Sequence, residues 1–160
     1  MSLILRPYEP GDRRAAIGLI HQLNVFEDAI SGDRAKDHAA AEACLDLDLR
    51  RAAEQGGAVV LALDCREAVG MMAFFIDRKE PYLSAEIGKV GHIAELVVDE
   101  RHRGQGIGTA LLEEAERLAR LHAVSRLRIG VIAGNGVARR AYERFGFRAA
   151  AIELTKEVGR

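Results

Sequence analysis

The residues most able to do chemistry form a glycine-rich stretch, residues 104–108, in which every second residue is glycine. An apolar run ends just before it at Val98, and a helical run begins just after it at Ala110. Glycines at a helix start leave backbone N–H groups without side-chain cover, and the positive end of the helix dipole favours an anion there. Arg101 and Arg103 add positive charge. The stretch therefore predicts a phosphate-binding turn between a strand and a helix.

Spacing excludes two common phosphate-binding loops. The dinucleotide fingerprint needs glycine at its first, third and sixth positions. The sixth position is Thr109 when counted from Gly104 and Leu111 when counted from Gly106, so neither register fits. A P-loop would need lysine before the hydroxyl residue, but Gly108 is followed directly by Thr109.

The pattern Arg-x-x-Gly-x-Gly does fit, and it is filled by Arg103, Gly106 and Gly108. It resembles the coenzyme A pyrophosphate loop of the GNAT superfamily of N-acetyltransferases. The resemblance implies that acetyl-coenzyme A binds as cosubstrate to this loop and to exposed backbone groups of the preceding strand, which splays from its neighbour in the superfamily. The implied coenzyme-binding residues here are Leu96, Val97, Val98, Arg103, Gly104, Gln105, Gly106, Ile107, Gly108 and Thr109.

A second motif downstream supports the resemblance independently. Asn135, Ala138 and Tyr142 fill the pattern Asn-x-x-Ala-x-x-x-Tyr, and Gly146 and Phe147 follow. This segment is similar to the last helix and strand of the superfamily, and the two motifs come in the superfamily's order. By resemblance, Asn135 and Ala138 contact the coenzyme, and Tyr142, about two turns later, faces the sulfur and protonates the leaving thiolate.

Acetyl transfer to an amine also needs a group that takes the amine proton. Glu95 lies within an apolar run, where burial would raise the pKa of its carboxyl group and make it a usable base through a water molecule. Two alternatives stay open: Glu95 points to solvent or binds an arginine, and His92 is the base instead. A histidine at a strand end is more often structural, so we rank Glu95 first.

The acceptor is an amine, either a small molecule or a peptide, and the sequence does not choose between them. Acidic residues outnumber basic ones in the turn after the first predicted helix. Two explanations stay open: these residues hold a cationic amine, or they form a solvated acidic face. They are Glu27, Asp28, Asp33 and Asp37. Tyr82, in a long predicted loop, is a candidate for lining the acceptor pocket. The alternative function is a non-catalytic acyl-coenzyme A binding or sensing module. The presence of Tyr142 favours a catalytic function over this alternative.

Composition excludes several other classes. The 160 residues carry a formal net charge of −1, which is not typical of a nucleic-acid-binding protein. The apolar runs are too short to span a membrane and the start of the chain lacks a secretory signal, so we expect a cytoplasmic protein. The five histidines and two cysteines lack metal-ligand spacing, so we expect no metal. The partner classes left open are the amine substrate and a second copy in a homodimer.

The chain has no repeat, low-complexity tract or linker, which predicts one domain of α/β (α+β) class over residues 1–160. The resemblance implies that this is a GNAT acetyltransferase domain. Alternating or continuous apolar runs predict strands near residues 3–6, 58–63, 69–76, 92–98, 127–131 and 147–154. Helical spacing predicts helices near residues 12–26, 34–55 and 135–145, and a further helix that begins at residue 107. The resulting order, β-α-α-β-β-β-α-β-α-β, resembles the GNAT fold, which implies a central, mixed and strongly twisted sheet flanked by helices. Residues 77–91 form the longest predicted loop.

Overall fold

A computed structural model describes residues 2–78 and 80–159 of the chain. Its strands are β1 (Leu3–Pro7), β2 (Gly57–Asp64), β3 (Glu67–Asp77), β4 (Val90–Val98) and β5 (Arg126–Ile129). Its α-helices are α1 (Arg13–Ser31), α2 (His38–Gln55), α3 (Ile107–Leu121) and α4 (Gly136–Phe145). Three short 3-10 turns join them: η1 (Pro10–Asp12), η2 (Ala85–Ile87) and η3 (Glu100–His102).

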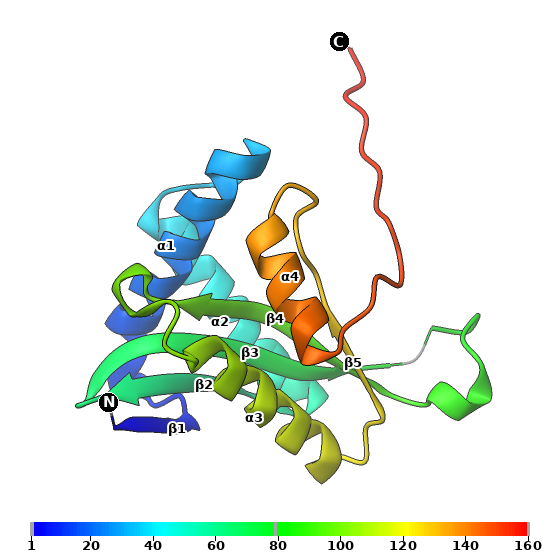
Figure 1. Ribbon diagram of the computed structural model, residues 1–160, viewed down its shortest axis with the longest axis horizontal. Helices are drawn as coiled ribbons and strands as arrows, with labels where there is room; N and C mark the ends of the chain where they lie inside the picture. The colour runs from blue at the N-terminus through cyan, green and yellow to red at the C-terminus, as the bar shows by residue number, and fades with distance from the viewer. Residues whose placement is uncertain (1, 79, 160) are drawn as a thin grey trace.

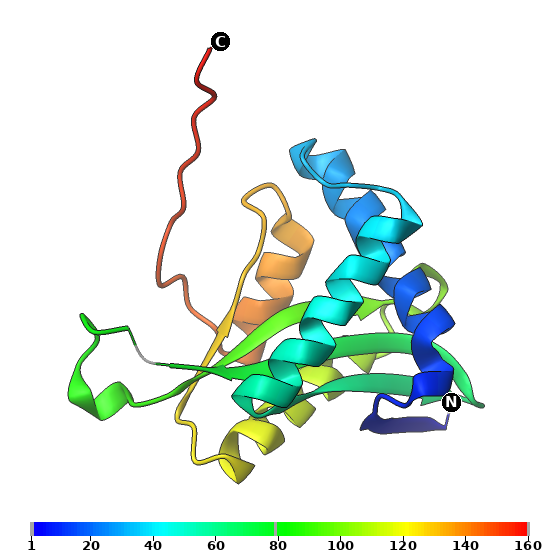
Figure 2. The same cartoon turned by 180° about the vertical axis from the view of Figure 1, so that it is seen from behind.

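The five strands form one sheet in the order β1-β2-β3-β4-β5. Neighbouring strands are antiparallel except β4 and β5, which run parallel. Helices α1 and α2 cover one face, and α3 and α4 lie on the other (Figures 1 and 2). The predicted class, a mixed sheet flanked by helices, is confirmed, and so is the order of elements as far as α4.

Two apolar clusters, one on each face of the sheet, hold these layers together. Leu45 of α2 and Ile20 of α1 are fully buried in the first, and Leu111 of α3 is fully buried in the second. β3 contributes to both, because successive side chains of a strand point to opposite faces: Ala73 joins the first cluster and Phe74 the second. This two-sided burial explains why the central strands are continuous apolar runs.

Several helices and strands begin or end at other residues than the sequence predicts. Helix α1 runs on to Ser31, where Gly32 ends it with a left-handed φ of 71°. The predicted loop 77–91 is shorter, because β4 already begins at Val90; Lys79, within this loop, lies outside the described residues.

The last predicted strand, residues 147–154, is wrong for this structure. Residues 148–159 have no secondary structure and are exposed, and they run away from the body of the molecule (Figures 1 and 2). A strand needs a neighbour to bond its backbone groups, and this segment lies beside none in the part of the chain that the structure describes. An alternating pattern alone therefore did not place it in the sheet.

Candidate active site

The site is built around an open edge of β4. β4 pairs with β5 only from Val90, opposite Arg126, to Ile93, opposite Ile129. At this point Ala94 is an extra residue relative to β3, since Ala73 faces Glu95 and Phe74 faces Ile93. A bulge of this kind bends and twists a strand. The rest of β4, including the predicted coenzyme-binding residues Leu96, Val97 and Val98, continues beyond the end of β5 and leaves one backbone edge unpaired.

The glycine turn follows directly and is held by Asp99. This side chain is 4% exposed and accepts hydrogen bonds from the Arg101 N–H at 3.0 Å and from Gln22 Nε2 of α1, also at 3.0 Å. These bonds, with those from Arg101 Nε and the His102 ring, keep the pKa of the Asp99 carboxyl well below its usual range despite burial. Asp99 thus fixes the end of β4 and the start of the turn against α1.

The backbone of the turn has the conformation that the glycines allow. Gly104 and Gly106 have left-handed φ angles of 74° and 83°. Gly106 is the N-cap residue of α3, so the first N–H groups of this helix point out of the turn, with no intrahelical acceptor. A Cβ atom added to Gly104 or Gly106 would meet no atom within 4 Å, so the space above the turn is open.

The predicted residues of the turn differ in what their side chains can do. Ile107 is 1% exposed and packs in the core, so only its backbone can face a ligand. Arg103 donates from Nε to the Val98 carbonyl oxygen at 3.3 Å, and its guanidinium lies 4.9 Å from the centre of the Phe26 ring of α1. Gly104, Gln105 and Thr109 are exposed, and Gly108 is half-buried.

Helix α4 lies on the same face as α3 and carries the second motif. The Asn135 side chain accepts a hydrogen bond from the Ala138 N–H at 3.1 Å, so it caps α4. Tyr142 is half-buried and its ring packs edge-on against Phe147, with centroids 6.0 Å apart. Burial, with a smaller contribution from the nearby Glu27 carboxylate, raises the pKa of Tyr142 to about 12. The phenol is therefore protonated at neutral pH.

Glu95 is on the bulged part of β4, on the face covered by α1 and α2. Burial is the main reason that the pKa of Glu95 rises to about 8, and the charges of Asp48 and Glu27 raise it further, while Arg34 opposes them. The carboxyl group is thus poised to exchange a proton near neutral pH, as the sequence predicts for a base. The charge of Glu27 raises the pKa of both Glu95 and Tyr142.

Asp48 is a member of this site that sequence reasoning missed. It is 3% exposed, and its Oδ2 atom has no hydrogen-bond partner in the described part of the chain. Burial raises its pKa to about 6. Its spacing could have revealed it: Asp48 lies three residues after Leu45 and four before Ala52, both on the buried face of α2. An aspartate on the apolar stripe of a helix faces the sheet.

The acidic residues at the end of α1 and in the turn after it are largely neutralised by nearby basic residues. Arg34 Nε lies 2.8 Å from Glu27, and Lys36 Nζ lies 2.7 Å from Asp28. The Asp33 carboxylate also pairs with Arg34, and Asp37 caps α2 by accepting the Ala40 N–H at 2.8 Å. Only Glu27 therefore reaches the site, and the rest of the predicted acidic patch is structural.

Two other candidates lie elsewhere. His92 Nδ1 is 3.1 Å from Asp77, and burial lowers the pKa of the imidazole, so the ring is mainly neutral at pH 7 and pairs with Asp77 as a structural contact. The expectation for Tyr82 is wrong: it is 83% exposed, in the connection at the opposite end of β4 from the glycine turn. The connection between antiparallel β3 and β4 necessarily lies at the start of β4.

Two cavities lie away from this site. A groove of about 410 Å³ follows the outer side of β5, and a cavity of about 650 Å³ lies near the start of β4, between Glu54 and Arg128. Among residues 2–78 and 80–159, no cluster of three or more histidine, cysteine or carboxylate side chains could hold a metal ion. No helix in these ranges is long and apolar enough to cross a membrane.

Residues 24–147 match the model of the Acetyltransferase (GNAT) family. A search of curated proteins finds no match. The structure resembles a GCN5-related N-acetyltransferase from Ralstonia eutropha, with TM-score 0.74, 21% identity, and 98% of this chain and 99% of that one covered. It also resembles glucosamine-6-phosphate N-acetyltransferase from Arabidopsis thaliana, with TM-score 0.69 and 20% identity, and the match covers 99% of this chain and 100% of that one. A third similar structure is a predicted acetyltransferase from Clostridium acetobutylicum, solved with acetyl-CoA. Its TM-score is 0.74 at 15% identity, and the match covers 98% of this chain and 96% of that one.

Proposed function

The chain belongs to the GNAT acetyltransferase family, and from this premise we propose that it moves an acetyl group from acetyl-coenzyme A to a primary amine. The observation that carries the proposal is the open edge of β4. Beyond Ile93 this edge runs from the half-buried Glu95 to the glycine turn that starts α3. An amine base and an anion-binding turn thus lie at two ends of one unpaired strand edge.

The residues of the turn fit a pyrophosphate. The free N–H groups at the start of α3 favour an anion, and the space above Gly104 and Gly106 allows one to approach the backbone. In this proposal the backbone of Leu96, Val97 and Val98 bonds the pantetheine arm as an additional strand would. Arg103 contributes positive charge at the rim, held in place by the Phe26 ring.

In the proposed reaction the amine attacks the thioester directly, in a complex that holds both substrates. Glu95 removes a proton from the acceptor ammonium through a water molecule. The amine nitrogen then forms a bond to the thioester carbonyl carbon and gives its second proton to solvent. The C–S bond breaks, and its electron pair stays on sulfur. Tyr142 donates its hydroxyl proton to this sulfur, and the proton taken by Glu95 returns to the phenol through solvent.

The raised pKa of Tyr142 limits what this step contributes. A pKa of about 12 lies above the value of about 8.5 for a free thiol, so complete transfer to the thiolate is uphill. The hydroxyl therefore acts mainly by donating a hydrogen bond to the sulfur while its charge develops. Such a donor accelerates the reaction without being indispensable.

The charges around the site favour an acceptor that arrives as a cation. The charges of Asp48 and Glu27 both act on Glu95, and among basic residues Arg34 opposes them there. Asp48, whose Oδ2 has no hydrogen-bond partner in the described part of the chain, adds negative charge that favours a cation near Glu95. Small-molecule and peptide amines both satisfy this requirement.

A screen of amines with acetyl-coenzyme A, read by thiol release, tests the proposal. The panel should contain diamines, amino sugars, amino acids and peptides with free N-termini. We expect thiol release with at least one cationic amine and little with uncharged aromatic amines of similar size. Tight binding of acetyl-coenzyme A without thiol release across the panel would instead indicate the non-catalytic binding module.

A further inference from the structure

Arg51 of α2 is a half-buried cation that lacks an anionic partner. Its guanidinium lies 5.6 Å from the centre of the Phe75 ring of β3, which is 1% exposed. Among residues 2–78 and 80–159, no carboxylate forms an ion pair with it; the charge of Asp48, one turn earlier on α2, acts on it only electrostatically. An arginine keeps its charge when it is partly buried, and that charge is costly unless it is paired. Arg51 is therefore available to bind an anion.

The register of the sheet places this cation close to Glu95. Glu95 of β4 faces Ala73 of β3, and Phe75, under Arg51, faces His92. Ala73 and Phe75 are two residues apart, so both point to the face that α1 and α2 cover. Two residues of a strand span about 7 Å. The positive charge of Arg51 therefore lies about one such step along the sheet from the row of Glu95, close enough for one small molecule to reach both.

The unpaired charges on this face change sign along the sheet. In the row of Glu95, the charge of Asp48 is the first to act on Glu95 after burial itself. Glu27 also acts there, but its carboxylate is paired with Arg34. Arg51, three residues after Asp48 on α2, supplies an unpaired positive charge in the next row. A molecule with an ammonium group at one end and an anionic group at the other is complementary to both rows.

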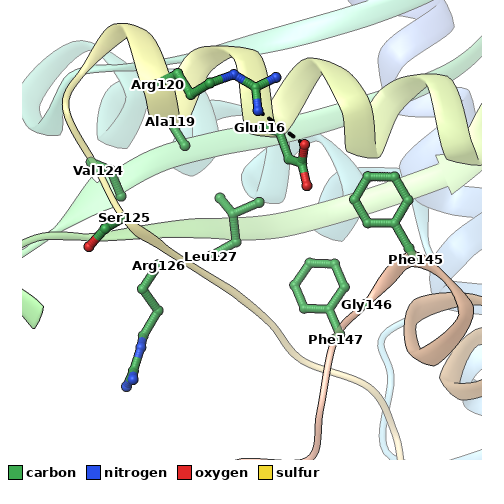
Figure 3. Close-up of a pocket in the computed structure, with 10 residues that line it drawn as sticks. All are labelled: Glu116, Ala119, Arg120, Val124, Ser125, Arg126, Leu127, Phe145, Gly146 and Phe147. Atoms are coloured by element: carbon green, nitrogen blue, oxygen red, sulfur yellow. Dashed lines mark hydrogen bonds and ion pairs between the residues drawn. The ribbon is translucent and has the colours of Figure 1, made fainter.

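A cavity beside Arg51 gives such a molecule room. This cavity of about 650 Å³ is lined by Gln55, one turn after Arg51 on α2, and by the ion pair between Asp77 and Arg128. The groove of about 410 Å³ along β5 differs in character. Figure 3 shows aromatic and aliphatic side chains in its centre, with Arg120 on its rim paired to Glu116. Of the two cavities, the one near Arg51 adjoins the half-buried cation without a partner.

We propose that the acceptor is an amino acid, whose carboxylate binds the Arg51 guanidinium while its ammonium group lies near Glu95. This inference rests on the proposed acetyl transfer and names the class of its acceptor. A guanidinium binds a planar carboxylate through two parallel N–H···O hydrogen bonds. A carboxylate also carries only one negative charge, so it approaches the nearby Asp48 with less repulsion than a doubly charged phosphate group.

The experiment compares amino acids with their carboxamides, which keep the ammonium group and the side chain but lose the negative charge. kcat/KM is measured with acetyl-coenzyme A for wild type, Arg51→Gln and Arg51→Lys, and for Arg50→Gln, whose exposed side chain makes it the matched control. We expect wild type and Arg50→Gln to prefer at least one amino acid over its carboxamide by ~10-fold or more. Arg51→Gln should lose this preference through slower reaction of the amino acid alone, and Arg51→Lys should restore part of it.

Calorimetry separates this inference from the proposed reaction. The same amino acids and carboxamides are titrated into protein saturated with coenzyme A, which has no acetyl group to transfer. We expect tighter binding of the amino acid to wild type but not to Arg51→Gln; this result without any acetylation would support the binding site and contradict acetyl transfer.

The opposite results would overturn the inference. Acetylation of amines without any preference for a carboxylate would exclude an amino acid as the acceptor and leave acetyl transfer standing. An equal loss for amino acid and carboxamide in Arg51→Gln would show that Arg51 only balances the charge of Asp48.

Discussion

Two carboxyl groups, the half-buried Glu95 and the buried Asp48, give the site its acid–base character. Glu95 is visible in the sequence as a charge within an apolar strand, whereas Asp48 lies in Leu45–Leu49, which alternates like a strand. Only the helical reading of this segment places Asp48 on the buried face of α2 beside Leu45. The two groups share one region, so the negative charge of either raises the free energy of ionising the other.

Removing the charge of Asp48 should lower the pKa of Glu95. Asp48→Asn keeps the size of the side chain, and the ionised Asp48 is the first charge, after burial itself, that raises the Glu95 pKa from its ordinary value to about 8. If Glu95 is the base, turnover rises as pH passes its pKa, and this limb should move to lower pH in the variant. The pH dependence of kcat measures the shift, and Asp46→Asn on the exposed face of α2 is the matched control. An unmoved limb would contradict the coupling.

Tyr142→Phe removes the hydroxyl group and keeps the ring that packs on Phe147. We expect turnover to fall by at least ~10-fold, because the departing sulfur loses its donor, while affinity for acetyl-coenzyme A changes little. Steady-state kinetics and calorimetry measure the two quantities. Wild-type turnover in the folded variant would assign Tyr142 a packing role only.

The glycine turn and the bulge in β4 are the elements that make the site. The turn could be predicted from sequence because its glycine spacing and flanking arginines are local features. The bulge could not, since it depends on how Ala73 and Phe74 of β3 meet Glu95 and Ile93 across the sheet. The strand predicted at residues 147–154 failed for a related reason: alternation shows that a segment can be a strand, but a neighbouring edge decides whether it becomes one.

Gly106→Ala tests the turn, and Gly32→Ala is its matched control. Both glycines have left-handed φ angles, 83° and 71°, and an added Cβ would meet no atom within 4 Å at either position. Each substitution should therefore cost a similar free energy of unfolding, about 1 kcal/mol. Only Gly106→Ala should reduce affinity for acetyl-coenzyme A, by ~10-fold or more, because its methyl group enters the space for the pyrophosphate. Equal affinities of the two variants by calorimetry would remove the turn from the coenzyme site.

The carboxyl groups of Asp48 and Glu95 also affect the stability of the whole molecule. The pKa values of Asp48 and Glu95 in the folded protein, about 6 and about 8, lie above their ordinary values. The folded state then binds more protons than the unfolded state, so this contribution is fully present below about pH 4 and is lost as pH rises through 6 and 8. Asp99, with a lowered pKa, has the opposite effect only in acid, outside this range.

We therefore expect the free energy of unfolding to decrease between pH 5 and pH 9, by a few kcal/mol at most. Glu95→Gln should flatten the upper part of this decrease, because the glutamine needs no proton to stay neutral. Urea unfolding at several pH values measures both proteins. Parallel curves for wild type and Glu95→Gln would show that Glu95 is not buried in the way the structure describes.

If coenzyme and amine meet at the open edge of β4 with Glu95 as the base, free thiol and acetylated amine must form together. Both products are measured for wild type and for Glu95→Gln. We expect equal amounts of the two products from wild type, and ~10²-fold or more slower formation of both by Glu95→Gln with acetyl-coenzyme A still bound. Thiol release without acetylated amine, or an unchanged rate in Glu95→Gln, would contradict it.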